Sequence, residues 1–133
     1  MRLITGGTDT HMVMLDVTPV IANGQMAETL LASVGIITNK NMIPYDTLPP
    51  SLGSGLRIGS PTMTTRGAKE EEMYEIGRLL GKVLKNKDNE ELLEQVKQEV
   101  RQLAVSHPMF SSEWMPEKIR AQFDAMYCHE TFE

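Results

Sequence analysis

The sequence contains little of several residue types on which whole classes of protein depend. Of its 133 residues only Cys128 is a cysteine, so no disulfide can form within the chain, and we expect a reducing, cytoplasmic location. Aromatic residues make up 5%, and 18 acidic residues outnumber 13 basic ones, which disfavours nucleic acid as a partner. No apolar run approaches the roughly 18 residues of a membrane span, and residues 1–7 lack the apolar segment of a signal peptide. We therefore expect neither a secreted disulfide scaffold nor a membrane protein.

The residues that are present predict one domain that begins with a strand, a helix and a second strand. Apolar residues make up 41% of the chain, enough for one real core. Residues 12–17 are apolar at five of six positions, which favours a strand covered on both faces. Residues 25–34 carry apolar side chains at helical spacing, with Gly35 placed for a left-handed helix end, and residues 36–38 predict the second strand.

The middle of the chain predicts a long irregular segment followed by a strand. Residues 39–55 contain three prolines and two glycines, which argues against a regular element there, and irregular segments of this length are often functional. Residues 56–59 then predict a strand. Alternation places Leu56 and Ile58 on one face, where we expect them buried, and Arg57 on the other, where we expect it to face a cleft.

The second half of the chain predicts three helices. An apolar stripe marks a helix over residues 69–84, with Glu70, Glu71 and Glu72 in its first turn. A helix capped by Asp88 or Asn89 continues to about residue 105, and a last helix begins near Pro116. The apolar face predicted for this last helix consists of Ile119, Phe123, Met126 and Tyr127. The fold class is therefore α/β, an α+β sandwich in which helices pack on a short mixed sheet.

Arg57 is the residue in this sequence that most suggests a binding site. It lies between strand-forming residues and glycines, after a loop and outside any charged helix face. A guanidinium binds the two oxygens of a carboxylate in one plane, so the arginine is suited to a carboxylate ligand. A structural ion pair with a nearby aspartate or glutamate explains the same residue, and the spacing alone leaves both alternatives open.

No other motif indicates chemistry by itself. The stretch Gly6-Gly7-Thr8-Asp9 lacks the lysine of a P-loop and the third glycine of a dinucleotide site, so we expect a tight turn into the first strand. The three histidines have no metal-site spacing, and the pair Cys128-His129 is isolated. The sequence contains no nucleophile–base set and no lysine placed for Schiff-base chemistry.

Four motifs in register over residues 6–73 resemble a known family. They are GGTDxH at 6–11, NKNxIP at 39–44, SGLRIGSP at 54–61 and TTRGxKEEEM at 64–73. Their order and spacing are similar to those of the C-terminal small domain of serine hydroxymethyltransferase. The resemblance implies residues 1–106 as that domain and residues 107–133 as a tail with a helix and no family signature.

The resemblance implies a function in one-carbon metabolism. The family consists of pyridoxal-phosphate-dependent transferases of fold type I, which convert serine and tetrahydrofolate into glycine and 5,10-methylenetetrahydrofolate. Its members are dimers or tetramers with active sites between subunits and domains. By resemblance, Arg57 binds the carboxylate of the amino-acid substrate, Asn41 contacts the folate pterin, and Pro50 lies in the loop that lines the folate pocket.

Two departures from the family shape the expected role. The lysine that carries pyridoxal phosphate lies in a large upstream domain that these residues do not include, and Pro49 and Ser51 stand where many members have serine and an aromatic residue. We therefore expect a fragment, a split-gene product or a truncated copy that is inactive without a cofactor-bearing domain, which is either supplied in trans or missing. The alternative is a stand-alone interaction or regulatory module, a homo-oligomer that retains the fold without the reaction.

Overall fold

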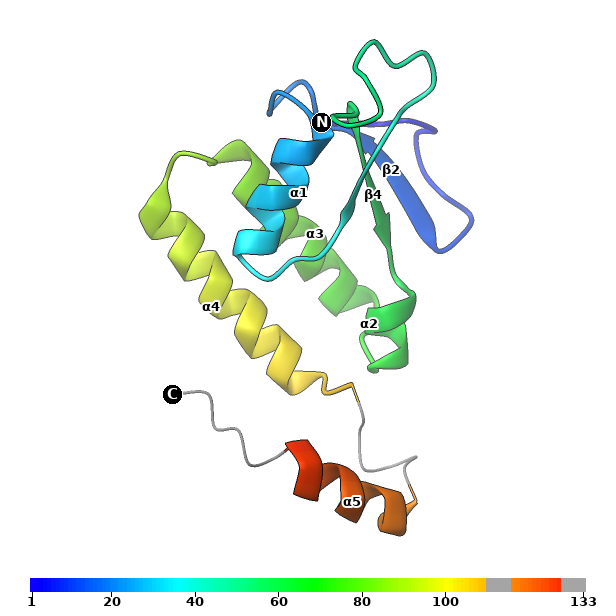
Figure 1. Ribbon diagram of the computed structural model, residues 1–133, viewed down its shortest axis with the longest axis vertical. Coiled ribbons are helices and arrows are strands. Elements are labelled where there is room, and N and C mark those ends of the chain that lie inside the picture. Colours follow the sequence, from blue (N-terminus) through cyan, green and yellow to red (C-terminus); the bar gives the residue numbers. More distant parts are fainter. Residues whose placement is uncertain (110–115, 128–133) are drawn as a thin grey trace.

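A computed structural model gives the fold of the protein and describes residues 1–109 and 116–127, with side chains described as far as residue 122. Figure 1 shows strands β2 and β4 on one side of the molecule and helices α1, α3 and α4 on the other. In chain order the elements are β1 (Arg2–Leu3), β2 (Met12–Asp16), α1 (Gly24–Ser33), β3 (Asn39–Asn41), β4 (Gly55–Gly59), α2 (Pro61–Thr65), α3 (Glu70–Lys85), α4 (Glu90–Ser106) and α5 (Glu117–Tyr127).

The strands form one antiparallel sheet in the order β1-β2-β4-β3. The predicted fold class is confirmed, because helices pack on a short sheet. The prediction that the sheet is mixed is wrong for the described strands, since every neighbouring pair runs antiparallel. Strands β1 and β2 form a hairpin, and β4 lies between β2 and β3 and runs antiparallel to both, so no two neighbouring strands are parallel.

The core lies between the sheet and the helices. Leu56 of β4 is fully buried and Ile58 is half-buried, so the predicted inward face of this strand is confirmed at its centre. The buried apolar residues form one cluster that combines side chains of β4, α1, α3 and α4 with others from the connections before and after α1: Val17, Ile21, Ala27, Leu31, Val34, Leu56, Leu79, Leu80, Val83, Leu84 and Val96. Burial of these side chains is the main driving force for the fold.

The helices begin and end where local signals place them. The Asn23 side chain caps α1 by accepting from the Met26 amide at 2.8 Å, and Asn89 caps α4 by accepting from the Leu92 amide at 3.1 Å. Gly35 adopts a φ of 87° at the predicted left-handed position after α1. A short helix, α2, and the edge strand β1 were not predicted from the sequence.

The second strand lies three residues later than residues 36–38, where the sequence predicted it. Residues 35 and 36 form the turn that ends α1, because the amides of Gly35 and Ile36 donate to the carbonyls of Ala32 and Leu31. Strand pairing then starts at Asn39, opposite Arg57. Residues 39–41, predicted to be irregular, are therefore β3.

The sheet has one covered face and one open face. Residues 12–17 were predicted to be covered on both faces, but Met12 is 44% exposed and Met14 is only half-buried. The helices pack on the opposite face, which holds Leu15, Leu56 and Ile58. The face of Met12 and Met14 is therefore available to a ligand.

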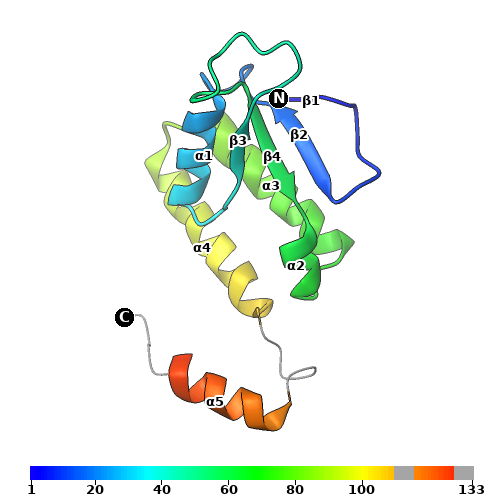
Figure 2. The same ribbon diagram turned by 45° about the vertical axis from the view of Figure 1, so that its right-hand side comes forward.

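Two segments extend beyond the sheet and its helix layer. Residues 42–54, which connect β3 to β4, project beyond the end of the sheet in both views (Figures 1 and 2). Helix α5 lies beyond the end of α4, where Ile119 is 54% exposed. The side chains of Phe123, Met126 and Tyr127, predicted to share its apolar face, lie outside the described residues, as do Cys128 and His129.

Candidate functional site

The register of the sheet places Arg57 in the middle of its open face. Leu56 is fully buried, so the next residue along β4 points to the opposite side. Met14 of β2 and Asn39 of β3 are paired with Arg57 on its two sides and share this face. The strand alternation read from the sequence therefore gives the correct orientation of this arginine.

The guanidinium of Arg57 makes one weak side-chain contact. Its Nη2 donates to the Oδ1 of Asn39 at 3.4 Å. Among the side chains that the structure describes, no carboxylate lies within 4 Å of Arg57, so the structural ion pair that the sequence left open is not found there. Asn39 carries no charge, which leaves the planar fork of the arginine available to a carboxylate.

Arg57 lines an open hollow of about 470 Å3. The other lining residues come from the β1–β2 connection and from β2: Thr5, Gly7, Thr8, Asp9, Thr10, Met12, Val13 and Met14. The predicted position of Arg57 beside a concave surface is thus confirmed, although the hollow is wide and not a narrow cleft. One guanidinium, one carboxylate and several hydroxyl groups make it suitable for a small zwitterion.

The connection that forms the rim of this hollow is held by its own threonines. The Thr5 hydroxyl donates to the Gly7 carbonyl at 2.5 Å, and the Thr10 amide donates to the Thr8 hydroxyl at 3.1 Å. In this connection the threonine hydroxyls form the hydrogen bonds that backbone groups of paired strands would form in a longer hairpin. Residues 6–9 were expected to turn into the strand predicted at residues 12–17, and they do lie in the connection that leads into this strand, β2. The short strand β1 before them was not expected.

Asn41 and Pro50 lie near the end of the sheet from which the 42–54 segment projects. Asn41 is opposite Gly55, and its Nδ2 donates to the Met42 carbonyl at 2.9 Å. Pro50 is exposed in a turn in which the Pro49 carbonyl accepts from the Leu52 amide at 2.9 Å. Neither residue lines the hollow of Arg57. The structure thus brings Asn41 onto the strand beside Arg57 and leaves Pro50 beyond the sheet.

Sequence reasoning missed Asp46, which organises the 42–54 segment. Its carboxylate accepts from the Ser54 hydroxyl at 2.6 Å and from the amides of Ser54 at 2.8 Å, Leu48 at 2.9 Å and Ile43 at 3.1 Å. These donors, the Ser54 hydroxyl first, hold the pKa of Asp46 far below its ordinary value. The bond to Leu48, two residues ahead, is the local turn signal that was present in the sequence.

A second carboxylate, Asp16, is buried where β2 ends. It accepts from the Thr18 hydroxyl at 2.6 Å and forms an ion pair with Arg2 at 3.3 Å. The hydrogen bond from Thr18, more than the pair with Arg2, lowers the pKa of Asp16. Asp16 is therefore a structural anion at the edge of the open face.

Other kinds of site find no support in the part of the chain that the structure describes. No group of three or more His, Cys, Asp and Glu side chains is arranged for a metal ion in residues 1–109 and 116–122. None of the described helices is long and apolar enough to cross a membrane. His107 bonds to the Leu103 carbonyl at 3.2 Å and lies 4.0 Å from Glu72, which is a structural environment.

Comparison with known protein families identifies a match over the first part of the chain. The sequence model of the family described as serine hydroxymethyltransferase matches residues 1–80, which is more than half of the 133 residues. The match covers the sheet, the open face with Arg57, the 42–54 segment and the first part of α3.

Proposed function

The chain belongs to the serine hydroxymethyltransferase family, and on this premise we propose that it is the C-terminal portion of such an enzyme. The assembled enzyme converts serine and tetrahydrofolate into glycine and 5,10-methylenetetrahydrofolate. This portion contributes contacts to the carboxylate of the amino acid and to the folate. It does not catalyse the transfer without a cofactor-bearing domain.

The observation that carries this proposal is the environment of Arg57. The guanidinium lines a hollow on the open face, and its one described side-chain contact is to the uncharged Asn39 at 3.4 Å. An arginine held without an anion in a concave surface favours an anionic ligand, and a carboxylate matches its two parallel donors. This supports the role that the family resemblance gives to Arg57.

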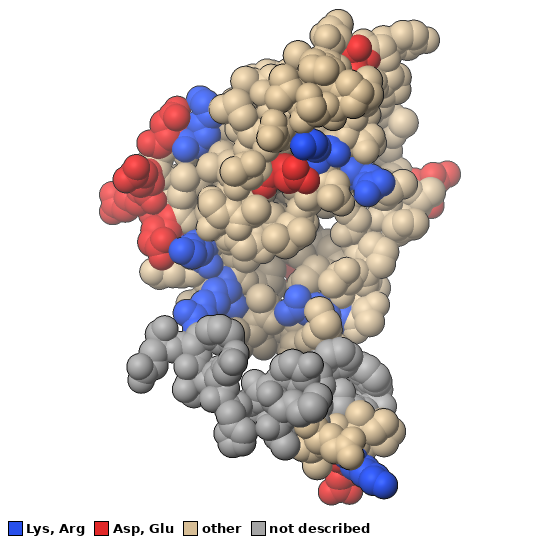
Figure 3. All heavy atoms as spheres, viewed as in Figure 1, with Lys and Arg blue, Asp and Glu red and all other residues tan. Residues whose placement is uncertain are grey.

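We assign the folate contacts to Asn41 and to the loop that contains Pro50. Asn41 lies on β3, two positions along from Asn39, so a ligand bound at Arg57 reaches it within about 7 Å along the strand. Figure 3 shows a largely uncharged surface at the end of the molecule from which the loop projects. Such a surface favours contact with a planar aromatic ring system over contact with a charged chain.

The residues around Arg57 do not fit pyridoxal phosphate, the cofactor of the family. The cofactor needs a lysine amine, and the residues that line the hollow include no lysine. Among the described lysines, Lys82 pairs with Glu99 and Lys87 pairs with Asp88 on the helix side of the molecule. The proposal therefore assigns the cofactor to a different domain and routes no chemical step through these residues.

An NMR titration of the 15N-labelled chain with L-serine tests the carboxylate site. We expect the signals of the Arg57 side chain and of the hollow to shift with L-serine and not with L-serinamide, which lacks the carboxylate. Arg57→Lys keeps the charge and loses the fork, so it should weaken the response about tenfold or more. Equal responses to the two ligands would contradict the assignment of Arg57.

Absorbance spectra with added pyridoxal phosphate test the expected inactivity. We expect no visible band from a lysine adduct and no turnover of serine by the chain alone. A band that borohydride converts into a stable lysine adduct would show that the chain binds the cofactor itself. The proposal that the cofactor is bound by a different domain would then be wrong.

The interaction module remains the second candidate, and one observation favours it. A hollow of about 520 Å3 beside α1 contains the apolar side chain of Met26, which is 48% exposed. The residues that line the hollow are Ile21, Gln25, Met26, Thr29, Leu30, Ser33, Lys87 and Asp88. An apolar side chain exposed in a hollow with a polar rim suits a contact with another chain. Sedimentation equilibrium separates the candidates: a stable homo-oligomer that Met26→Glu dissociates favours the module, whereas a monomer favours the enzyme portion.

A further inference from the structure

The 42–54 segment presents one aromatic side chain in a costly backbone conformation. Tyr45 has a φ of 61°, and in the described part of the chain it is the only residue other than glycine with a positive φ. Its side chain is 101% exposed, so no packing inside the protein compensates for this conformation. L-residues with bulky side chains avoid this region, and exceptions concentrate at functional positions.

The residue after Tyr45 fixes this conformation. Asp46 receives its four hydrogen bonds from three points that lie before and after it in the chain, at Ile43, Leu48 and Ser54. The carboxylate therefore ties the start of the segment to its end. A segment closed in this way keeps Tyr45 in one place with no contact from the ring itself.

The closed segment is in turn anchored to the fold. The Gly53 carbonyl accepts from the Gly24 amide at 2.7 Å, and the Leu52 carbonyl accepts from the Gln25 amide at 3.0 Å, so the segment is bonded to the start of α1. Gly53 has a φ of 59°, and a Cβ at this position would lie 2.7 Å from the Asn41 carbonyl oxygen. The position of Tyr45 is thus fixed relative to Asn41.

We propose that Tyr45 contacts the planar ring system of a reduced folate and that Asp46 is the positioning residue that presents it. This inference rests on the proposed function and names the side chain that the folate loop uses. Tyr45 is the only aromatic residue between positions 42 and 54, and Asp46 is the only charged one. Since the carboxylate is occupied by its own loop, the aromatic ring is the group left for recognition of a flat ligand.

Isothermal titration of the full chain with 5-formyltetrahydrofolate tests the contact. Tyr45→Asn removes the ring and suits the left-handed conformation, so we expect affinity to fall about tenfold while the melting temperature rises by about 4 °C. Tyr45→Phe should keep both values. The matched control is Tyr74→Asn on α3, where the side chain is 78% exposed and both values should stay unchanged. A purely structural role cannot give higher stability together with weaker binding.

The positioning role of Asp46 has its own readout. Asp46→Asn should weaken folate binding about tenfold and speed amide exchange at Ile43, Leu48 and Ser54, whereas Tyr45→Asn should leave these amides protected. Ser54→Ala removes the hydroxyl donor and keeps the charge, so it provides a milder variant with a smaller effect in the same direction.

The outcomes separate this inference from the proposed function. If the unmodified chain binds the folate and Tyr45→Asn binds it equally well, the assignment of Tyr45 is wrong and the proposed function stands. If Asp46→Asn retains full affinity, the positioning role is wrong. If the unmodified chain does not bind the folate at all, the proposed folate contacts are wrong, and this inference is wrong with them.

Discussion

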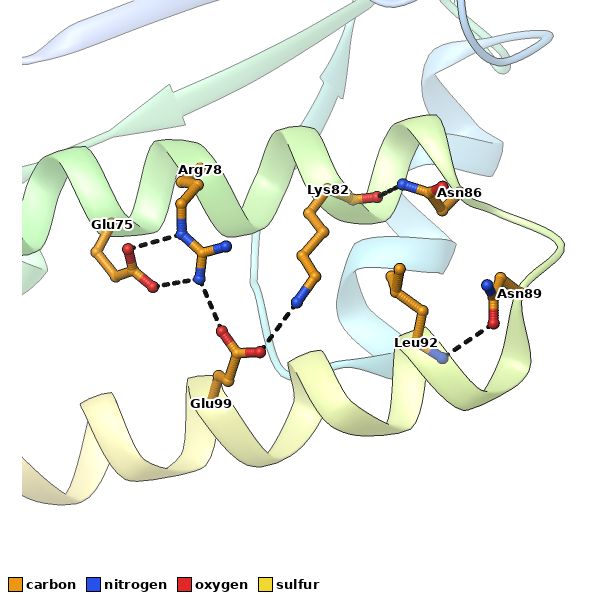
Figure 4. A network of polar contacts seen from close by, with 7 residues as sticks. All are labelled: Glu75, Arg78, Lys82, Asn86, Asn89, Leu92 and Glu99. Atoms are coloured by element: carbon orange, nitrogen blue, oxygen red, sulfur yellow. Dashed lines mark hydrogen bonds and ion pairs between the residues drawn. The ribbon is translucent and has the colours of Figure 1, made fainter.

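Two arginines on opposite sides of the molecule have opposite environments. Arg78 of α3 donates to both carboxylate oxygens of Glu75, at 2.8 and 2.6 Å, and to Glu99 of α4 at 2.8 Å, while Lys82 also bonds to Glu99 (Figure 4). Arg57 of β4 donates to one amide oxygen at 3.4 Å. The guanidinium of Arg78 therefore has three carboxylate contacts, whereas the guanidinium of Arg57 has one weak contact to an amide oxygen.

This difference shows how to tell a structural cation from a binding one. Arg78 has acidic residues on its own helix and on the neighbouring helix, and its contacts join α3 to α4. Arg57 lies between the uncharged side chains of Met14 and Asn39. Solvent exposure does not separate the two residues, because both are exposed, whereas the charges of their neighbours do.

The largest expected effect on the free energy of unfolding comes from the buried face of β4, and the open face of the same strand should contribute little. Leu56→Ala should lower the free energy of unfolding by about 3 kcal/mol, because it leaves a cavity at a fully buried position. Arg57→Ala, one residue further, should change it by less than about 0.5 kcal/mol. Urea denaturation measures both values. A large loss of stability from Arg57→Ala would mean that this arginine is structural, as Arg78 is.

A third arginine extends the comparison to a partly buried position. Arg66 donates to the Ala104 carbonyl at 2.6 Å and to the His107 carbonyl, so it caps the last turn of α4. Arg66→Ala should lower the free energy of unfolding by about 1.5 kcal/mol. Faster amide exchange should be confined to the end of α4. Unchanged exchange there would contradict the capping role.

Removal of Arg78 should have a smaller effect than removal of Arg66. Its side chain is 44% exposed, so water screens the pairs with Glu75 and Glu99, and we expect Arg78→Ala to lower the free energy of unfolding only slightly. The loss should shrink further in 1 M NaCl. A loss that is independent of salt would indicate packing of the aliphatic part of the side chain as its source.

The smallest expected effect is the pH dependence of this ion-pair network. The hydrogen bond from Lys82 lowers the pKa of Glu99, and the hydrogen bond from Arg78 lowers the pKa of Glu75. The stabilisation is therefore present above the unfolded value of 4.5 and is lost as the pH falls through the lower folded values. The stability difference between the unmodified chain and Arg78→Ala should vanish near pH 2. A difference that persists at this pH would exclude the two carboxylates as its cause.

The fold was predictable wherever neighbouring residues decide it. The alternation at Leu56, Arg57 and Ile58 gave the orientation of β4, and the helical spacing of apolar residues gave α1, α3 and α4. The prediction of a strand at residues 36–38 was wrong, because the amides of Gly35 and Ile36 are used in the turn that ends α1. The sequence contains no local signal that the strand begins only at Asn39.

The candidate site was predictable only in part. Arg57 stood out because a lone cation among strand formers is unusual, and its place on the face opposite Leu56 followed from the alternation. The hollow beside it is formed by the β1–β2 connection and became visible only in the structure. Asp46 did not stand out, because three of its four bonds depend on the closure of the loop onto Ile43 and Ser54. The exposure of Tyr45 and its positive φ were likewise invisible before the segment was folded.

The sequence by itself determined β2, β4 and the helices α1, α3 and α4, the inward side of β4 at Leu56, and a cap for α4 at Asp88 or Asn89. These features depend on side chains and backbone groups within about four residues of one another. The tertiary structure alone decided which cations bind partners on another element. Glu99 meets Arg78 across 21 residues of chain, and Arg66 reaches Ala104 across 38. Such partners are selected by the packing of whole elements against the core, which no local pattern encodes. For the same reason only the folded chain shows that no described carboxylate lies within 4 Å of Arg57.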